Sequence, residues 1–187
     1  IDHQSTIEDF VVINAENGPV YIEDNVYVEA HTRLEGPLYI GSHSRILGGS
    51  IKHSSIGKYC KISGEVSHSI FQSYSNKAHG GFIGHSYINE WVNLGAFTTT
   101  SNLKNTYGSI NIKKNKKNIS THLQFFGSLI GDHVKTSVGT TLNCGTILHL
   151  GACLFNHAIT QKEYAPFSWG GGTKKELFKF DKFISTA

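Results

Sequence analysis

The sequence predicts an all-β fold, a left-handed parallel β-helix of hexapeptide repeats with a protruding hairpin arm and a short C-terminal helix. Two observations support this prediction. An aliphatic side chain recurs every six residues, and a small or β-branched residue follows most of these positions at the fourth place. The repeated positions, one of them a threonine, are Ile22, Val28, Leu34, Ile40, Ile46, Ile56, Ile62, Ile88, Leu94, Ile130, Thr136, Leu142, Leu148 and Leu154. The small residues are Val26, Thr32, Ser44, Ser50, Cys60, Val66, Val92, Thr98, Val134, Thr140, Thr146, Ala152 and Ala158, and Leu38 is the bulky exception.

A period of six suits a short strand followed by a turn, so that three repeats complete one triangular coil. An α-helix would instead repeat its pattern every 3.6 residues. Each aliphatic side chain then points into the coil and stacks on its counterpart in the next coil, where its burial stabilises the fold by roughly 1.5–3 kcal/mol. A β-sandwich would show two-residue alternation with turns at irregular intervals. The regular period therefore favours the β-helix.

The predicted elements follow in order along the chain. Residues 1–21 are expected to form a lead-in segment, and residues 22–160 the β-helix. The β-helix is interrupted by an arm at 103–124, where two alternating runs flank Lys114-Asn115-Lys116, a pattern typical of a β-hairpin. Residues 161–187 are expected to form a C-terminal loop and a helix that caps the apolar column.

Composition limits the classes of function. The chain has 187 residues, which is the length of one domain, and its net charge of +3 is too small to predict nucleic-acid binding. We recognise no signal peptide and no apolar run of membrane-spanning length, so a cytoplasmic protein without a membrane partner is expected. The three cysteines are widely spaced, and Cys60 falls on a small corner position. A buried, reduced thiol is therefore expected there, rather than a disulfide or a zinc site.

Histidine is abundant, at eleven copies. His31, His43 and His133 each fall three residues after an inward position, at outward turns, where we expect solvated side chains. His149 has no partner at a familiar metal-ligand spacing, and the pattern predicts no zinc site.

His79 has a different setting from these histidines. It ends a polar stretch in which the six-residue period is lost, and the following Gly80 and Gly81 allow backbone or substrate to approach closely. Asn93 and Asn102 lie further along, one on a coil and one where the arm departs. A neutral imidazole with amide side chains nearby is suited to abstract a proton from an amine. A structural histidine in a turn is the alternative interpretation.

Two segments carry a resemblance to a known family. Lys77-Ala-His-Gly-Gly-Phe-Ile-Gly-His-Ser86 and Trp91-Val-Asn-Leu-Gly-Ala-Phe-Thr-Thr-Thr-Ser-Asn102 resemble the acetyltransferase half of bifunctional sugar-1-phosphate nucleotidyltransferase/acetyltransferases. Further similar stretches are Leu123-Gln-Phe125, Ile130-Gly-Asp-His133 and Phe167-Ser-Trp-Gly-Gly171. The resemblance covers most of residues 20–172, and its most specific part is 77–102.

This resemblance implies an acetyl-CoA-dependent N-acetyltransferase acting on an amino-sugar 1-phosphate. His79 matches the family's catalytic base, Asn93 and Asn102 match amides that hold the amino sugar, and Ala96 matches a backbone contact to acetyl-CoA. The family is trimeric, with active sites between neighbouring β-helices, so a homotrimer is expected. Its N-terminal half is a nucleotidyltransferase. Because this chain begins with Ile1 and contains no methionine, we expect such a half to precede it.

Departures from the family pattern leave alternatives open. Phe82 occupies the substrate site where better-known members have a tyrosine, and Leu103-Lys104-Asn105 replaces tyrosine-aspartate-glycine. No residue securely matches the basic residues that bind the sugar phosphate; the candidates by charge are Lys77, Lys104, Lys113, Lys114, Lys116 and Lys117. One alternative is a non-catalytic solenoid that trimerises and regulates a nucleotidyltransferase. Another is a metalloenzyme resembling carbonic anhydrase, for which the histidine spacing supplies no obvious ligand set.

Overall fold

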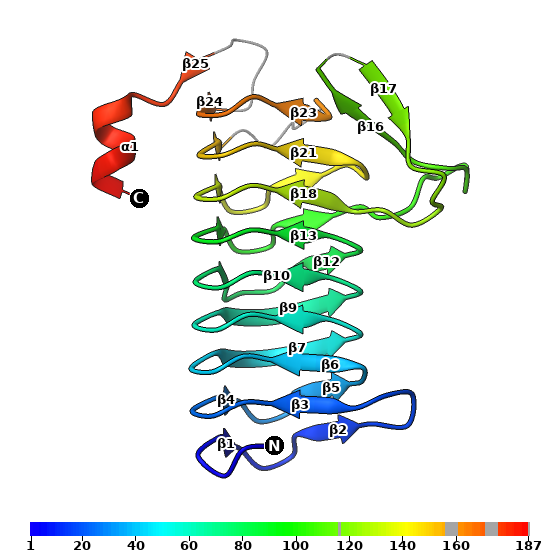
Figure 1. The fold of residues 1–187 in the computed structure, drawn as a ribbon, viewed down its shortest axis with the longest axis vertical. Helices are drawn as coiled ribbons and strands as arrows, with labels where there is room; N and C mark the ends of the chain where they lie inside the picture. Colours follow the sequence, from blue (N-terminus) through cyan, green and yellow to red (C-terminus); the bar gives the residue numbers. More distant parts are fainter. Residues whose placement is uncertain (116, 156–160, 171–175, 187) are drawn as a thin grey trace.

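The chain folds into a stack of three-sided coils, with the hairpin arm and one helix beside it (Figure 1). The structure is a computed structural model, which describes residues 1–115, 117–155, 161–170 and 176–186. Successive coils pair through parallel strands, which confirms the predicted left-handed parallel β-helix.

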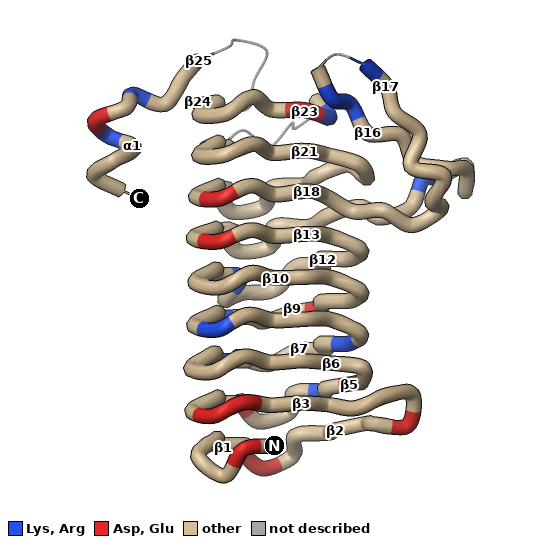
Figure 2. The backbone as a smooth tube through the Cα atoms, viewed as in Figure 1, with Lys and Arg blue, Asp and Glu red and all other residues tan. Residues whose placement is uncertain are grey.

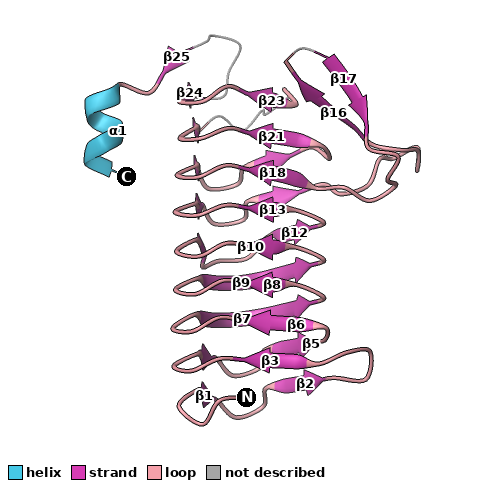
Figure 3. Cartoon of the chain, in the orientation of Figure 1, coloured by secondary structure: helices cyan, strands magenta, loops and turns pink. Residues whose placement is uncertain are grey.

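Strands of two to eight residues line three faces of the coils (Figure 3). The first face is an 8-stranded sheet of β3 (Val20–Ile22), β6 (Leu38–Ile40), β8 (Ser55–Ile56), β10 (Ile70–Phe71), β13 (Tyr87–Ile88), β18 (Ser128–Ile130), β21 (Thr146–Leu148) and β23 (Glu163–Tyr164). The second contains β1 (Thr6–Ile7), β4 (Tyr27–Val28), the first parts of β7 (Arg45–Lys52) and β9 (Lys61–Ser67), β11 (Asn76–Lys77), β14 (Asn93–Leu94), β19 (Lys135–Thr136), β22 (Cys153–Leu154) and β24 (Ser168–Gly170), with β25 (Glu176–Leu177) antiparallel at its end. The third contains β2 (Val12–Asn14), β5 (Arg33–Glu35), the second parts of β7 and β9, β12 (Phe82–Gly84), β15 (Thr99–Thr100) and β20 (Thr141–Leu142).

We name the corners by the faces that they join. Corner one joins the first face to the second, corner two joins the second to the third, and corner three leads to the first face of the next coil. Many corner residues have a positive φ although they are not glycine, including Tyr59 and Trp91 at corner one, Phe97 at corner two and His68 at corner three. This left-handed conformation reverses the chain direction within a tight turn.

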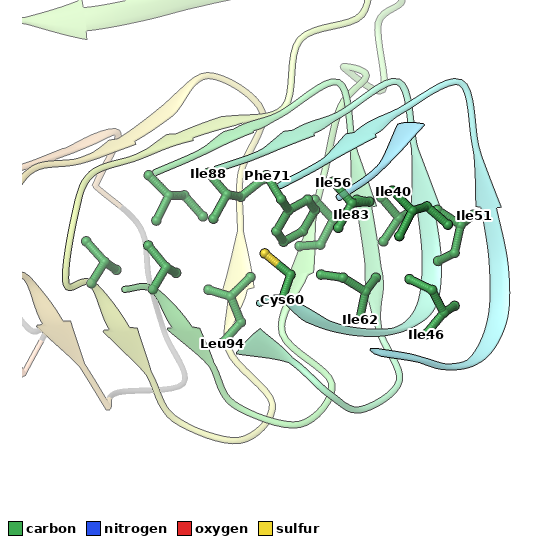
Figure 4. Close-up of a cluster of buried hydrophobic side chains, with 14 of the residues drawn as sticks. Ile40, Ile46, Ile51, Ile56, Cys60, Ile62, Phe71, Ile83, Ile88 and Leu94 are labelled. Atoms are coloured by element: carbon green, nitrogen blue, oxygen red, sulfur yellow. The ribbon is translucent and has the colours of Figure 1, made fainter. Parts of the chain in front are cut away.

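The repeated aliphatic positions form the predicted apolar column. All of them, together with Thr136, are buried, with at most 6% of any residue exposed. Figure 4 shows part of this column, in which Ile46 and Ile62 stack on one face and Ile40 and Ile56 on another. Cys60 is fully buried at a corner and free, as predicted, and burial raises the pKa of its thiol to about 11.

The six-residue period shifts where corner two is shortened. In β7 and β9 the chain passes this corner through glycines with positive φ, so Ile51 and Val66 become the next inward residues after Ile46 and Ile62. A Cβ atom at Gly49 would lie 2.1 Å from the carbonyl oxygen of Gly64 in the next coil. Only glycine allows the backbones to approach this closely, and the shortened corner explains why the sequence pattern lost the period here.

The arm is an antiparallel hairpin of β16 (Asn111–Lys114) and β17 (Lys117–Ser120), as predicted. It leaves and rejoins the β-helix at corner three, where Leu103 and Phe125 form an antiparallel bridge. Ile110, which is fully buried, anchors its base. At its far end the backbone N–H of Asn115 donates to Glu163 of β23.

The ends of the chain differ in detail from the expected organisation. β1 and β2, within the expected lead-in, already pair with β4 and β5, so the parallel ladder begins before Ile22. The C-terminal helix α1 (Phe180–Thr186) lies beside corner one rather than across the end of the column (Figure 1). Its buried residue, Phe183, packs edge-on against the ring of His133 there, at a centroid distance of 5.7 Å. In the described part of the chain, helical structure is too short and too polar to cross a membrane.

Candidate functional site

The exposed imidazole of His79 is the centre of the candidate site. It stands at corner two, directly after β11 and before β12, and its neighbours Gly80 and Gly81 complete the turn. A Cβ at Gly81, whose φ is +121°, would lie 2.3 Å from the carbonyl oxygen of Thr98. The second glycine is therefore required for packing on the next coil, and it keeps His79 at the surface of a tight turn.

Ala96 lies at the same corner, one coil further along. The two coils are joined here because the N–H of Phe97 donates to the carbonyl oxygen of Gly80 at 2.8 Å. The Phe97 ring covers Gly80, where a Cβ would lie 3.1 Å from the ring. The structure thus brings the predicted base and the predicted backbone contact to acetyl-CoA to adjacent turns.

Asn93 lies on the outer side of the second face in that same following coil. It is exposed and pairs in register with Asn76, which precedes His79 by three residues. His79, Asn93 and Ala96 therefore belong to one region, at corner two and the adjoining edge of the second face. We call these three residues the His79 group.

Phe82 and Asn102 form a separate group with His85, on the third face and corner three. The ring of Phe82 and the amide of Asn102 both lie over Gly84, because a Cβ there would be 2.3 Å from the ring and 2.7 Å from the amide nitrogen. The amide nitrogen of Asn102 is 2.9 Å from Nδ1 of His85. We call these the Asn102 group; within one chain no described contact joins it to the His79 group.

The basic residues predicted to bind the substrate are in different surroundings. Lys77 is only 1% exposed and points into the coil, so it does not reach a substrate at the surface. Lys104 donates to the carbonyl oxygen of Ser109 within the arm. Lys113, Lys114 and Lys117 are exposed on the arm, seen in blue on β16 and β17 in Figure 2, and Lys116 lies outside the described residues.

A column of histidine rings at corner three was not predicted from the sequence. His53, His68 and His85 lie one coil apart: the rings of His53 and His68 are tilted, with centroids 4.8 Å apart, and those of His68 and His85 stack at 4.7 Å. Phe125 of the arm stacks on His85 at 5.2 Å. Burial lowers the pKa of His68 and of His85, and the neighbouring imidazole acts in the same direction. Their spacings of fifteen and seventeen residues, one coil each, are the sequence signal that could have revealed the column.

Acidification is expected to destabilise the protein through His68. An imidazole whose pKa is lowered by folding binds its proton more weakly in the folded state. The contribution of the neutral His68 to the free energy of unfolding is therefore complete above the ordinary histidine pKa of about 6.5. It is lost as the pH falls from there towards the lower pKa that His68 has in the folded state. In urea unfolding at pH 7.5 and 5.5, His68→Asn should show a smaller acid-induced loss than the unchanged protein.

The matched control is His31→Asn, which replaces an exposed corner histidine of similar positive φ. Asparagine tolerates this conformation, so both substitutions keep the turn. If His68→Asn and His31→Asn changed the pH dependence equally, the burial of His68 would not be its cause.

The histidines predicted to be solvated at outward turns differ in their exposure. His31 and His43 are exposed, as predicted. The prediction for His133 was wrong, because its ring is half-buried between Trp91 and Phe183. His79 and His85 lie at different corners. Among the described residues, no three histidine, cysteine or acidic side chains are grouped to hold a metal ion.

Two relatives share the family suggested by the sequence. A scan against models of known protein families finds no match. The chain is 30% identical over 99 residues, 53% of its length, to a Sulfurisphaera tokodaii protein named bifunctional sugar-1-phosphate nucleotidylyltransferase/acetyltransferase. It is 33% identical over 109 residues, 54% of its length, to a Methanococcus aeolicus protein named bifunctional protein GlmU. These matches cover 25% and 26% of the two relatives, so the chain spans about a quarter of their length.

The fold also matches a solved structure. A Bacillus cereus protein assigned as an acetyltransferase superposes with a TM-score of 0.52, over 98% of this chain and 89% of that chain. At 11% sequence identity this likeness shows the fold alone. The two relatives confirm the resemblance to the bifunctional family over about half of the chain, and the solved structure confirms the β-helical fold.

Proposed function

We propose that this chain is an N-acetyltransferase that transfers the acetyl group of acetyl-CoA to an amino-sugar 1-phosphate in cytoplasmic sugar-nucleotide biosynthesis. The observation that carries the proposal is the exposed His79 at a glycine-lined corner, one coil from Ala96 and three residues after Asn76, which pairs in register with Asn93. The names of the two relatives support the reaction class. They also support a nucleotidyltransferase domain as the partner of this β-helix in the same polypeptide.

In the proposed reaction, His79 accepts a proton from the substrate's amino group as the nitrogen attacks the thioester carbonyl. The N–C bond forms and the C–S bond breaks, and the sulfur leaves with the proton returned by the imidazolium, as the CoA thiol. General base help of this kind accelerates a reaction by about 10²- to 10⁴-fold. Backbone N–H groups at the corner are the donors available for the oxyanion, each typically worth about 2.7–4 kcal/mol.

We further propose that the active enzyme is a homotrimer whose sites lie between neighbouring β-helices. Support comes from the division of the candidate residues into the His79 group at corner two and the Asn102 group at corner three. No described contact joins the two groups within one chain, whereas corner two of one copy and corner three of another can face the same substrate across an interface. A mixture of a His79 variant and an Asn102 variant should then regain part of the activity that each lacks.

A second candidate function, a non-catalytic trimerising solenoid, is favoured by a specific observation. Three of the predicted substrate contacts are occupied within the chain: Lys77 is buried, Lys104 bonds Ser109, and Phe82 lies against Gly84 without a hydroxyl to offer. A solenoid of this kind would not need to bind acetyl-CoA.

Calorimetric titration with acetyl-CoA distinguishes the two functions. The transferase is expected to bind it with a dissociation constant in the micromolar to low millimolar range that is usual for enzyme substrates. It should also release CoA thiol when a hexosamine 1-phosphate is added. Absence of binding at millimolar acetyl-CoA by the folded, trimeric protein would favour the non-catalytic solenoid and overturn the transferase.

A further inference from the structure

Lys77 is a lysine in the apolar column of the β-helix. It pairs in register with Ile62, so its side chain takes the inward position that Ile46, Ile62 and Leu94 occupy in neighbouring coils of the second face. It is 1% exposed, and among the described residues it is the only buried side chain that carries a full charge. An aliphatic residue would fill this position without placing a charge in the column.

The ammonium group of Lys77 is held by two backbone carbonyls. Nζ donates to the carbonyl oxygen of Ser63, in the preceding coil, at 2.7 Å and to that of His79 at 2.9 Å. Gly64 leaves the space for this arrangement, because a Cβ there would lie 2.9 Å from Nζ. Hydrogen bonds from a charged donor are stronger than neutral ones, so this pair ties the His79 turn to the coil beneath it.

The His79 turn needs such a restraint. It continues into Gly80 and Gly81, which restrict the backbone least of all residues, and the His79 imidazole makes no hydrogen bond with the described side chains. The turn is otherwise joined to neighbouring coils where the N–H of Phe97 donates to Gly80 at 2.8 Å and that of Glu65 donates to Gly81 at 3.1 Å. The carbonyl of His79 itself is held by Lys77.

We propose that Lys77 is a positioning residue that fixes the His79 turn from inside the β-helix, so that the imidazole is presented to the substrate in one orientation. The effect of Lys77 on catalysis rests on the proposed function, whereas its effect on the His79 turn does not. This role also explains why a lysine lies two residues before the candidate base although it does not contact the substrate.

The test variant is Lys77→Met, which keeps an unbranched apolar stem and removes the two hydrogen bonds. The reporters are the amide protons of Glu65 and Phe97, which bond to the turn, and their exchange is followed by NMR. Loss of the ammonium should raise their exchange rates by about tenfold, the factor that corresponds to one hydrogen bond. Amides at corner one, such as that of Tyr74, should be unchanged.

Lys61→Met is the matched control, because Lys61 is an exposed lysine on the same face, one coil earlier. It should leave both exchange and transfer unchanged. If the chain transfers acetyl groups, Lys77→Met should lower kcat by about 10- to 100-fold through misplacement of the base, with the KM for acetyl-CoA changed less than about threefold. A rise in KM with constant kcat would overturn the positioning role.

The exchange and kinetic results separate the two proposals. Faster exchange of Glu65 and Phe97 in a protein that lacks transferase activity would support the role of Lys77 while the proposed function fails. Unchanged exchange in folded Lys77→Met would overturn it, whatever the activity. If Lys77→Met does not fold, Lys77→Leu, which copies Leu94 in the same column, takes its place. Failure of both variants to fold where Lys61→Met folds would show that Lys77 serves the whole β-helix, and this too would overturn the proposal.

Discussion

Replacement of His79 by asparagine is expected to lower the rate of acetyl transfer by about 10²- to 10⁴-fold, the contribution of a general base. The asparagine amide has no basic nitrogen to accept the proton of the substrate's amino group, so the attack on the thioester loses its assistance. Because His79 is exposed and its side chain makes no hydrogen bond with the described residues, folding should be unaffected. The measurement is kcat, from the release of CoA thiol at saturating acetyl-CoA and hexosamine 1-phosphate.

His31→Asn is the control for this substitution. His31 is also an exposed histidine at corner two, but it lies in the N-terminal coils and stacks on Phe10 at 5.3 Å. Its replacement should leave kcat within about twofold of the unchanged protein. Equal activity of His79→Asn and the unchanged protein would refute His79 as the base, and an equal loss in both variants would point to a general effect on the fold.

The largest effect on stability is expected from Ile62→Ala. Ile62 is fully buried at the centre of the column, between Ile46 and Lys77 on the second face. Its truncation removes apolar contacts and leaves a cavity that the stacked coils cannot close, which typically lowers the free energy of unfolding by about 2–5 kcal/mol. Urea unfolding followed by circular dichroism measures the change.

Ile70→Ala provides the same chemical change on the outside of the fold. Ile70 lies in the following strand, β10, and is 43% exposed. Its truncation should lower the free energy of unfolding by less than about 1 kcal/mol, because water already covers much of the side chain. Similar losses for the two variants would show that the stability does not depend on the inward column.

The fold could be predicted because one physical requirement repeats along the chain. An inward aliphatic side chain such as that of Ile40 must pack on its counterpart in each neighbouring coil, and this requirement produces a six-residue repeat in the sequence. The six-residue pattern fails where glycines shorten corner two, so Ile51 and Val66 were not recognised as inward, although both are fully buried. Only the coil-to-coil pairing shows how a shorter corner restores the column.

The candidate site could be predicted only in part. The glycines after His79 and the family resemblance identified the segment, but they did not show which polar residues face inward. Lys77 illustrates this: its charge suggested a substrate contact, whereas it is six residues after the inward Phe71 and six before the inward Ile83. The histidines of corner three were missed for a different reason: their spacings of fifteen and seventeen residues correspond to one coil each, not to the six-residue repeat that we followed.

The way the arm joins the β-helix has a consequence for how such proteins diversify. The N–H of Phe126 donates to the carbonyl oxygen of Asn102, and that of Gly127 donates to His85 in the preceding coil. The two ends of the arm therefore lie next to each other, and the coil continues to stack on the preceding coil directly after the arm. A hairpin of different length or charge can therefore be accommodated at this point without a change in the coils that carry it.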